Sequence, residues 1–132
     1  MTLYEECIKS LDNNYEIIIN EEKEHLLKSI FASFRLTNWG KINWSLKENY
    51  IKLNDFKEVI NYLKRLGIDR KFEFYIIWDQ TDLPLIKTDF NLIFSMDDIL
   101  AVSFDTWLFV PQKNLIIEFY HDGDITIGIN NF

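Results

Sequence analysis

The sequence predicts an α+β fold, with an antiparallel β-meander in the C-terminal half and about three helices mainly in the N-terminal half. Apolar residues recur at helical spacing in three segments that precede Gly67. After residue 72 the apolar segments are shorter, rich in β-branched and aromatic residues, and separated by turn residues. The chain has 132 residues, 48% hydrophobic and 16% aromatic, so we expect residues 1–132 to form a single domain with a sizeable core.

Two helices and a strand are expected in the first 34 residues. Residues 2–12 have an amphipathic pattern whose apolar face carries Cys7, so we expect a buried, unreactive thiol there. Residues 15–19 are short and β-branched, which favours a strand. Asn20 is the expected N-cap of the second helix, where nearby acids would favour the positive end of the helix dipole. The expected buried face of this helix comprises Leu26, Leu27, Ile30, Phe31 and Phe34.

One or two strands within residues 37–53 and a third helix are expected next. Asn54 is the expected N-cap of the third helix. Gly67 is expected to end it, because glycine readily takes the positive φ of a helix terminus. The side chains expected to face inward from this helix are Phe56, Val59, Ile60 and Leu63.

The C-terminal half is expected to hold strands at residues 72–78, 101–110, 114–120 and 124–129. Leu83 and Pro84 interrupt regular structure, and Asp89 is expected to cap a short helical turn. Asp122 and Gly123 predict a two-residue hairpin turn, because both residues tolerate positive φ. We expect the helices to pack on one side of this sheet.

A four-residue loop at residues 111–114, taken together with the predicted hairpin, gives a register for the last strands. Trp107 should lie opposite Glu118, and Asp105 opposite Tyr120, with all four on one face. The other face would carry Phe104, Leu108, Ile117 and Phe119 as core. The first face has two interpretations. In one of them it is a binding surface, which its aromatic and acidic side chains suit. In the alternative the face is covered, and Trp107 and Tyr120 belong to the core beside Ile125 and Ile127.

Charge is unevenly distributed along the chain. Residues 73–132 hold 10 acids and 2 bases, whereas residues 35–72 hold 4 acids and 9 bases, and the net charge is −7. A concentrated negative field suits a basic partner, although net charge also keeps a protein soluble. Nucleic acid is not expected as a partner, because phosphate binding needs a basic surface. The single cysteine, the lack of a signal-like start and the lack of a long apolar run favour a cytoplasmic protein without a membrane partner.

Catalytic and metal-binding patterns are mostly missing from the sequence. The two histidines and one cysteine do not form the groupings that zinc needs, and neither a calcium loop nor a glycine-rich phosphate loop occurs. The acid pairs Asp97–Asp98 and Asp122–Asp124 could do acid–base chemistry, but solvated turn residues are the simpler interpretation. We therefore expect no enzyme, no metal and no other cofactor. A small hydrolase with a carboxylate site is kept as a lesser hypothesis.

Part of the C-terminal half resembles a known family. The relevant segments are residues 75–79 (YIIWD), 101–108 (AVSFDTWL) and 117–128 (IEFYHDGDITIG). They are similar to bacterial immunity proteins of contact-dependent growth inhibition and related polymorphic toxin systems. The resemblance implies a small, acidic, cytoplasmic and non-catalytic protein. It would bind the C-terminal toxin domain of a large secreted protein, often a nuclease, and block the active site of that toxin.

The sequence thus favours an immunity protein whose acidic, aromatic C-terminal half occludes a basic toxin domain, either a ribonuclease or a deoxyribonuclease. Acids would take the place of substrate phosphates, and aromatic rings would supply apolar anchors. The residues expected to contact the toxin are Asp79, Asp82, Asp105, Glu118, Asp122, Asp124, Trp78, Trp107 and Tyr120. The alternative function is a ligand-binding or adaptor module with an aromatic pocket around Trp39, Trp44 and Trp78.

Overall fold

A seven-stranded antiparallel sheet organises the protein in the computed structural model, which describes residues 1–47 and 49–130. The strands are β1 (Glu16–Ile18), β2 (Tyr50–Leu53), β3 (Glu73–Trp78), β4 (Leu85–Asp89), β5 (Thr106–Val110), β6 (Leu115–Phe119) and β7 (Ile125–Ile129). Their order across the sheet is β1-β4-β3-β5-β6-β7-β2. The helices are α1 (Leu3–Ser10), α2 (Asn20–Ser33), α3 (Phe56–Arg65) and α4 (Met96–Leu100), with short 3-10 turns η1 (Trp44–Leu46), η2 (Phe90–Ser95) and η3 (Pro111–Lys113). The predicted α+β fold is confirmed.

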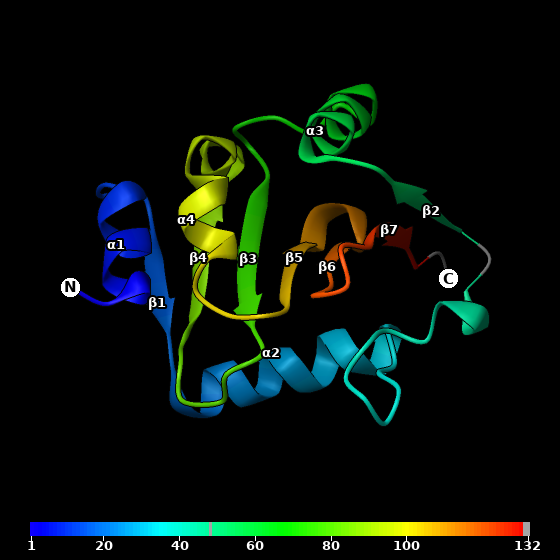
Figure 1. Ribbon diagram of the computed structural model, residues 1–132, viewed down its shortest axis with the longest axis horizontal. Helices are drawn as coiled ribbons and strands as arrows, with labels where there is room; N and C mark the ends of the chain where they lie inside the picture. The colour runs from blue at the N-terminus through cyan, green and yellow to red at the C-terminus, as the bar shows by residue number, and fades with distance from the viewer. Residues whose placement is uncertain (48, 131–132) are drawn as a thin grey trace.

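Helices cover both faces of the sheet, so the expectation that they pack on one side is wrong. Figure 1 shows α2 running below the strands and α3 above them, and α4 packs in the same core as α3, opposite the core that α2 covers. The cause is the composition of the central strands. Every residue of β5 and β6 is buried, so both faces of these strands need an apolar cover.

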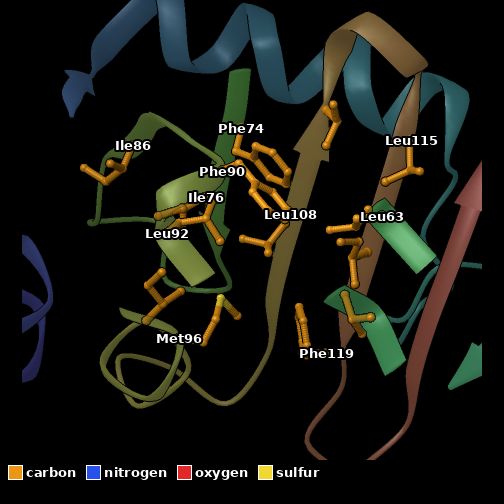
Figure 2. Packing of buried hydrophobic residues seen from close by; sticks show 14 of the residues in the cluster. Leu63, Phe74, Ile76, Ile86, Phe90, Leu92, Met96, Leu108, Leu115 and Phe119 are labelled. Atoms are coloured by element: carbon orange, nitrogen blue, oxygen red, sulfur yellow. The ribbon is translucent and has the colours of Figure 1, made fainter. Parts of the chain in front are cut away.

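The larger core lies between the sheet and α1, α3 and α4. Leu63 of α3 and Met96 of α4 point toward the same layer as Ile76 of β3, Leu108 of β5 and Phe119 of β6 (Figure 2). Cys7 of α1 is part of this core, which confirms the buried thiol, and burial raises its pKa to about 12. A thiol with such a pKa is a poor nucleophile at neutral pH.

The second core lies between the sheet, α2 and the segment that comes after α2. It contains Ile30 of α2 and Phe34, the residue that follows the last turn of α2. Trp107 and Phe109 of β5 also belong to it, and they alternate along the strand with Leu108 of the larger core. The predicted buried face of α2 is confirmed, because Leu26, Leu27 and Phe31 also pack here. Within the described residues no helix is both long and apolar enough to cross a membrane.

Both predicted asparagine caps are corrected by the structure. Asn20 is the first residue of α2 and has a left-handed φ of 57°, whereas an N-cap needs extended backbone, which Ile19 supplies without a side-chain cap. Helix α3 begins one residue later than Asn54 predicts. Its N-cap is Asp55, whose Oδ1 accepts a hydrogen bond from the backbone N–H of Glu58 at 2.9 Å. Gly67 comes after α3 with a positive φ of 78°, as expected.

Several strand boundaries also differ from the prediction. Residues 85–89 form β4, which was not predicted, because the break at Leu83 and Pro84 masks the short strand that begins directly after it. Strand β5 begins only at Thr106, and residues 101–105 are not a strand. Within residues 37–53, β2 is the single named strand of the described part, preceded by η1 and by an isolated bridge between Leu36 and Ile42. Residue 48 lies outside the described residues.

A close approach between β7 and η1 leads to a first prediction. A Cβ added at Gly128 would lie 2.3 Å from Cζ3 of Trp44, so Gly128→Ala must displace the indole ring. We expect a loss of about 1–3 kcal/mol in the free energy of unfolding, together with a changed Trp fluorescence, measured during urea unfolding. Gly67→Ala is the control for the fluorescence change. An alanine at this position would be strained by the positive φ, but its Cβ would meet no atom within 4 Å and would displace no ring. An unchanged fluorescence in Gly128→Ala would contradict the close packing.

Candidate functional site

Glu118 is the most unusual side chain on the face for which the sequence leaves two interpretations open. It lies opposite Trp107, as the predicted register requires, but its exposed fraction is 0%. Trp107 is also buried, under α2, where Phe31 packs edge-to-face against its ring at a centroid distance of 5.5 Å. The covered-face interpretation therefore holds for these two residues. Ile125 and Ile127 do not lie beside them, because they alternate with Thr126 and face the other core.

Three hydrogen bonds satisfy the buried Glu118 carboxylate. Its Oε2 accepts from the backbone N–H of Ile42 at 2.7 Å and from Nε1 of Trp107 at 3.0 Å, and its Oε1 accepts from Nε1 of Trp44 at 2.9 Å. Burial raises the pKa of Glu118 above its ordinary value, although these hydrogen bonds act in the opposite direction. The carboxylate thus joins β6 to β5 and to the segment that carries Ile42 and Trp44.

Residues 36–43 form a short hairpin that displays Trp39. Leu36 pairs with Ile42, and Thr37 and Lys41 are linked by a backbone hydrogen bond of 2.7 Å. The turn closes at Gly40, whose φ is 87° and whose N–H donates to the carbonyl of Thr37. Trp39 precedes this glycine and is 70% exposed. So large an exposed ring on an ordered turn is typical of a contact surface.

Lys41 ties the same hairpin to the Asp122–Gly123 turn. Its Nζ lies 2.8 Å from Asp124 and 3.5 Å from Asp122, and 4.9 Å from the ring centroid of Tyr120. The hydroxyl of Tyr120 donates to the carbonyl of Trp39 at 3.3 Å. The hydrogen bond and charge of Lys41 lower the pKa of Asp124. Three of the predicted toxin contacts therefore have partners within this chain.

An open cleft of about 810 Å³ lies beside the hairpin. Residues of α2 line one side together with Leu36, Trp39 and Gly40, and the loop between β3 and β4, residues 79–84, lines the other. Ile77 and Trp107 lie at its base, on the sheet. Figure 1 shows the β3–β4 loop reaching down to α2, which brings residues far apart in sequence to one place.

The cleft is acidic. Glu24, Asp79, Asp82 and Asp105 line it, and Lys23 is the single base among the described residues of the lining. Lys23 is already engaged, because its Nζ donates to the backbone carbonyls of the β3–β4 loop, at 2.8 Å for Thr81. Within residues 1–47 and 49–130, neither Asp79 nor Asp82 forms an ion pair. The cleft therefore offers carboxylates to a cation from outside the chain.

Asp105 connects the cleft to the last hairpin. It is 7% exposed, and its Oδ1 lies 2.7 Å from the backbone N of His121 and 2.9 Å from Nδ1 of the same residue. Its own backbone N–H donates to Oδ1 of Asp79 at 3.2 Å. Asp79, Asp105 and His121 thus form one connected polar group at the edge of the cleft.

The structure divides the nine predicted contact residues. Five of them line the cleft, namely Asp79, Asp82, Asp105, Trp78 and Trp107. Trp78, Trp107 and Glu118 are buried, so they support the surface and do not form its exposed part. Tyr120, Asp122 and Asp124 lie outside the cleft lining and contact Lys41. Phe104, expected in the core, is 85% exposed because residues 101–105 leave the sheet.

The aromatic pocket proposed as an alternative is not formed by its three tryptophans. Trp44 packs in the core beneath the hairpin, and Trp78 belongs to the opposite core, where its Nε1 donates to the carbonyl of Ile99 at 3.0 Å. Of the three rings, only Trp39 is exposed, and its position beside the acids of the cleft was not predicted because its hairpin is distant from them in sequence. Within the part of the chain that the structure describes, no group of three or more His, Cys, Asp or Glu side chains could hold a metal ion.

Comparison with protein families decides the class of this chain. A family model described as CdiI immunity protein EcoliA0-like matches residues 1–128. The chain belongs to this family. The match extends through the N-terminal half, beyond the segments on which the resemblance rested. No curated protein matches the sequence.

Membership gives the CdiI-like protein a function in outline. Its family is one of immunity proteins that neutralise a toxin, and such proteins are generally non-enzymatic. The geometry is compatible with this class, because the cleft presents charge and an aromatic ring to a partner. Neither Asp97–Asp98 nor Asp122–Asp124 lines the cleft.

Proposed function

We propose that this CdiI-like protein neutralises a basic nuclease toxin domain by placing its acidic cleft and Trp39 over the active site of that domain. The observation that carries the proposal is the presence at one cleft of an exposed indole and of two carboxylates, Asp79 and Asp82, that form no ion pair within the described residues. Nuclease active sites hold phosphates with basic side chains. Carboxylates at hydrogen-bonding distance can substitute for those phosphates.

Asp79 and Asp82 are the proposed charge contacts. They are exposed, they line the cleft from the β3–β4 loop, and Lys23 holds that loop against α2. A braced loop loses little conformational entropy on binding, which favours affinity. Asp105 lies deeper and is shared with His121, so it would act mainly by adding to the negative field.

Trp39 is the proposed apolar anchor. Its neighbour in the cleft lining, Leu36, is 40% exposed, so the hairpin offers a small apolar surface next to the acids. Interfaces commonly combine a desolvated aromatic anchor with charges at the rim. Tyr120, Asp122 and Asp124 would flank this contact, with their charges partly neutralised by Lys41.

The proposal includes the setting in which the toxin acts. We place the protein in the cytoplasm, as the single cysteine favours, and we treat residues 1–132 as one domain. The single sheet, which takes β1 and β2 from the N-terminal half and β3 to β7 from the remainder, supports the second point.

Capture of the toxin domain from the source cell, followed by a nuclease assay, tests the proposed function. An equimolar amount of this protein should abolish cleavage of RNA or DNA by the captured domain. The variant Asp79→Asn/Asp82→Asn should associate at least about fivefold more slowly at low salt, because electrostatic steering is lost. Its association rate should also depend less on salt concentration.

Asp97→Asn/Asp98→Asn is the matched control, because it changes the net charge equally on α4, which covers the other face of the sheet. Equal slowing in both double variants would mean that total charge, and not the cleft, steers the toxin. A captured toxin without nuclease activity would overturn the nuclease part of the proposal while leaving the cleft to be tested.

A small ligand is the second candidate for this cleft. The volume of about 810 Å³ falls within the range of ligand sites, roughly 300–1,000 Å³. This candidate would be favoured by a low-molecular-mass compound that copurifies with the wild-type protein but not with the variant Trp39→Ala.

A further inference from the structure

The hairpin of residues 36–43 has few internal contacts that could stabilise it. Its internal contacts are the bridge between Leu36 and Ile42 and the hydrogen bonds around the turn at Gly40. A two-stranded hairpin of this size is at best marginally stable in water. Its position must therefore depend on contacts with the rest of the protein.

Two groups of contacts attach the hairpin to the sheet. One lies at the surface, where Lys41 contacts Asp122, Asp124 and the ring of Tyr120, and where the hydroxyl of Tyr120 donates to the carbonyl of Trp39 at 3.3 Å. The two carboxylates are 45% and 40% exposed, and ion pairs with such solvated groups contribute little, about 0–1 kcal/mol. The other is the buried carboxylate of Glu118, which accepts hydrogen bonds from Ile42 at the end of the hairpin and from Trp44 just beyond it.

The buried attachment is specific in its geometry. The N–H of Ile42 is the donor of the shortest of the three bonds, at 2.7 Å, and this residue is 2% exposed. The ring of Trp44 fits over Gly128, where even a methyl group would collide with it. A carboxylate is required at this position, because its two oxygens face three N–H groups and only an acceptor on each side satisfies them all.

We infer that Glu118 is a positioning residue: it holds the hairpin of residues 36–43 on the sheet and thereby places Trp39 at the cleft. Glu118 itself is fully buried and does not contact the toxin. The effect of Glu118 on toxin binding rests on the proposed function. The positioning of the hairpin can be tested in the free protein, without the toxin. This positioning role explains why Glu118, one of the acids predicted to contact the toxin, lies in the interior.

The first test uses amide hydrogen exchange in the free protein, with the variant Glu118→Gln. The amide of glutamine has a donor where the carboxylate had an acceptor, so at least one N–H group loses its partner. The protected amides of Thr37 and Asn43, which bond to Lys41 and Arg35, should exchange at least about tenfold faster, which corresponds to about 1.4 kcal/mol. The same amides should be unaffected by Thr126→Val, a change opposite Glu118 on β7.

The second test is a double-mutant cycle for binding of the captured toxin domain, with Glu118→Gln and Trp39→Ala. If Glu118 acts through Trp39, each single variant weakens binding and the double variant is no weaker than Trp39→Ala. A merely structural role would instead give losses that add. Leu108→Ala, in the opposite core, serves as a control that lowers stability without weakening binding by the folded protein.

The outcomes separate the inference from the proposed function. Unchanged exchange at Thr37 and Asn43 in Glu118→Gln, or additive losses in the cycle, would overturn the positioning role. Trp39→Ala with wild-type toxin affinity would overturn the cleft as the binding surface, and the exchange result would then decide the positioning role by itself. Faster exchange with non-additive binding losses supports both.

Discussion

Replacement of Glu118 by alanine should lower the free energy of unfolding by about 3–5 kcal/mol. The variant removes the acceptors of three N–H groups, those of Ile42, Trp44 and Trp107. Each buried N–H group left without a partner costs about 1–3 kcal/mol, and water entering the vacated space recovers part of this. Urea unfolding at neutral pH measures the difference.

Thr126→Val is the matched control for this prediction. Thr126 lies directly opposite Glu118 on β7 and is also fully buried, but its hydroxyl has no hydrogen-bond partner within the described residues. Removal of an unsatisfied hydroxyl should therefore change the free energy of unfolding by less than about 1 kcal/mol. A loss below about 1 kcal/mol for Glu118→Ala would contradict the assigned hydrogen bonds.

The same carboxylate makes a prediction about pH. The folded-state pKa of Glu118 is raised above its ordinary 4.5 by burial, so the folded protein holds this proton more tightly than the unfolded chain does. The part of its stabilisation that comes from this pKa difference is fully present below the ordinary pKa and is lost as the pH rises through the raised value, whereas the hydrogen bonds to the carboxylate oxygens remain. The difference in unfolding free energy between wild type and Glu118→Gln should therefore decrease with rising pH above 4.5. A difference that increases with pH would contradict the raised pKa.

Replacement of Trp39 by alanine should weaken toxin binding by about 2 kcal/mol, or about thirtyfold in Kd, with little change in stability. The indole is 70% exposed in the free protein, so its removal costs little in folding. Aromatic rings that become desolvated at an interface are among the residues with the largest binding losses on truncation. Titration calorimetry with the captured toxin domain measures the change.

Phe94→Ala is the comparison for Trp39→Ala. Phe94 is 83% exposed in η2 and does not line the cleft, so it reports the general effect of removing a surface aromatic ring. Its loss should leave the Kd unchanged within about twofold. Similar losses for both variants would show that the contact is not centred on the cleft.

The elements of the fold that depend on local pattern were predictable. The faces of α2 and α3 arise from periodicity, and the Trp107–Glu118 register arises from the four-residue loop of residues 111–114, so both are encoded by neighbouring residues.

The predicted two-residue turn at Asp122 and Gly123 is wrong. Phe119 pairs with Ile125 and the N–H of Tyr120 donates to the carbonyl of Asp124, so the loop holds the three residues 121–123, of which only Gly123 has a positive φ. The N-caps were each misplaced by one residue. Asp55 is as suitable a cap as the predicted Asn54, whereas α2 begins after Ile19, which provides no side-chain cap and therefore gives no signal in the sequence. Strand β4 was missed because a proline before a strand gives the same signal as a proline in a loop.

The candidate site was predicted only in part, for a physical reason. Asp79, Asp82 and Asp105 were identified from charge and do meet at one cleft. The sequence pattern does not distinguish an exposed acid from one such as Glu118, which is buried because N–H groups of a distant segment reach it. That segment, with Trp39 at its turn, comes to the sheet through tertiary contacts, and no local periodicity encodes them.

Amide hydrogen exchange of the protein with and without the captured toxin domain tests the central claim most directly. We predict that binding protects residues 36–43 and 79–84, the two sides of the cleft, and leaves α3 and α4 unchanged. Protection confined to α3, α4 or the strand β2 edge, with exchange at the cleft unaffected, would contradict the assignment of the cleft as the toxin-binding surface.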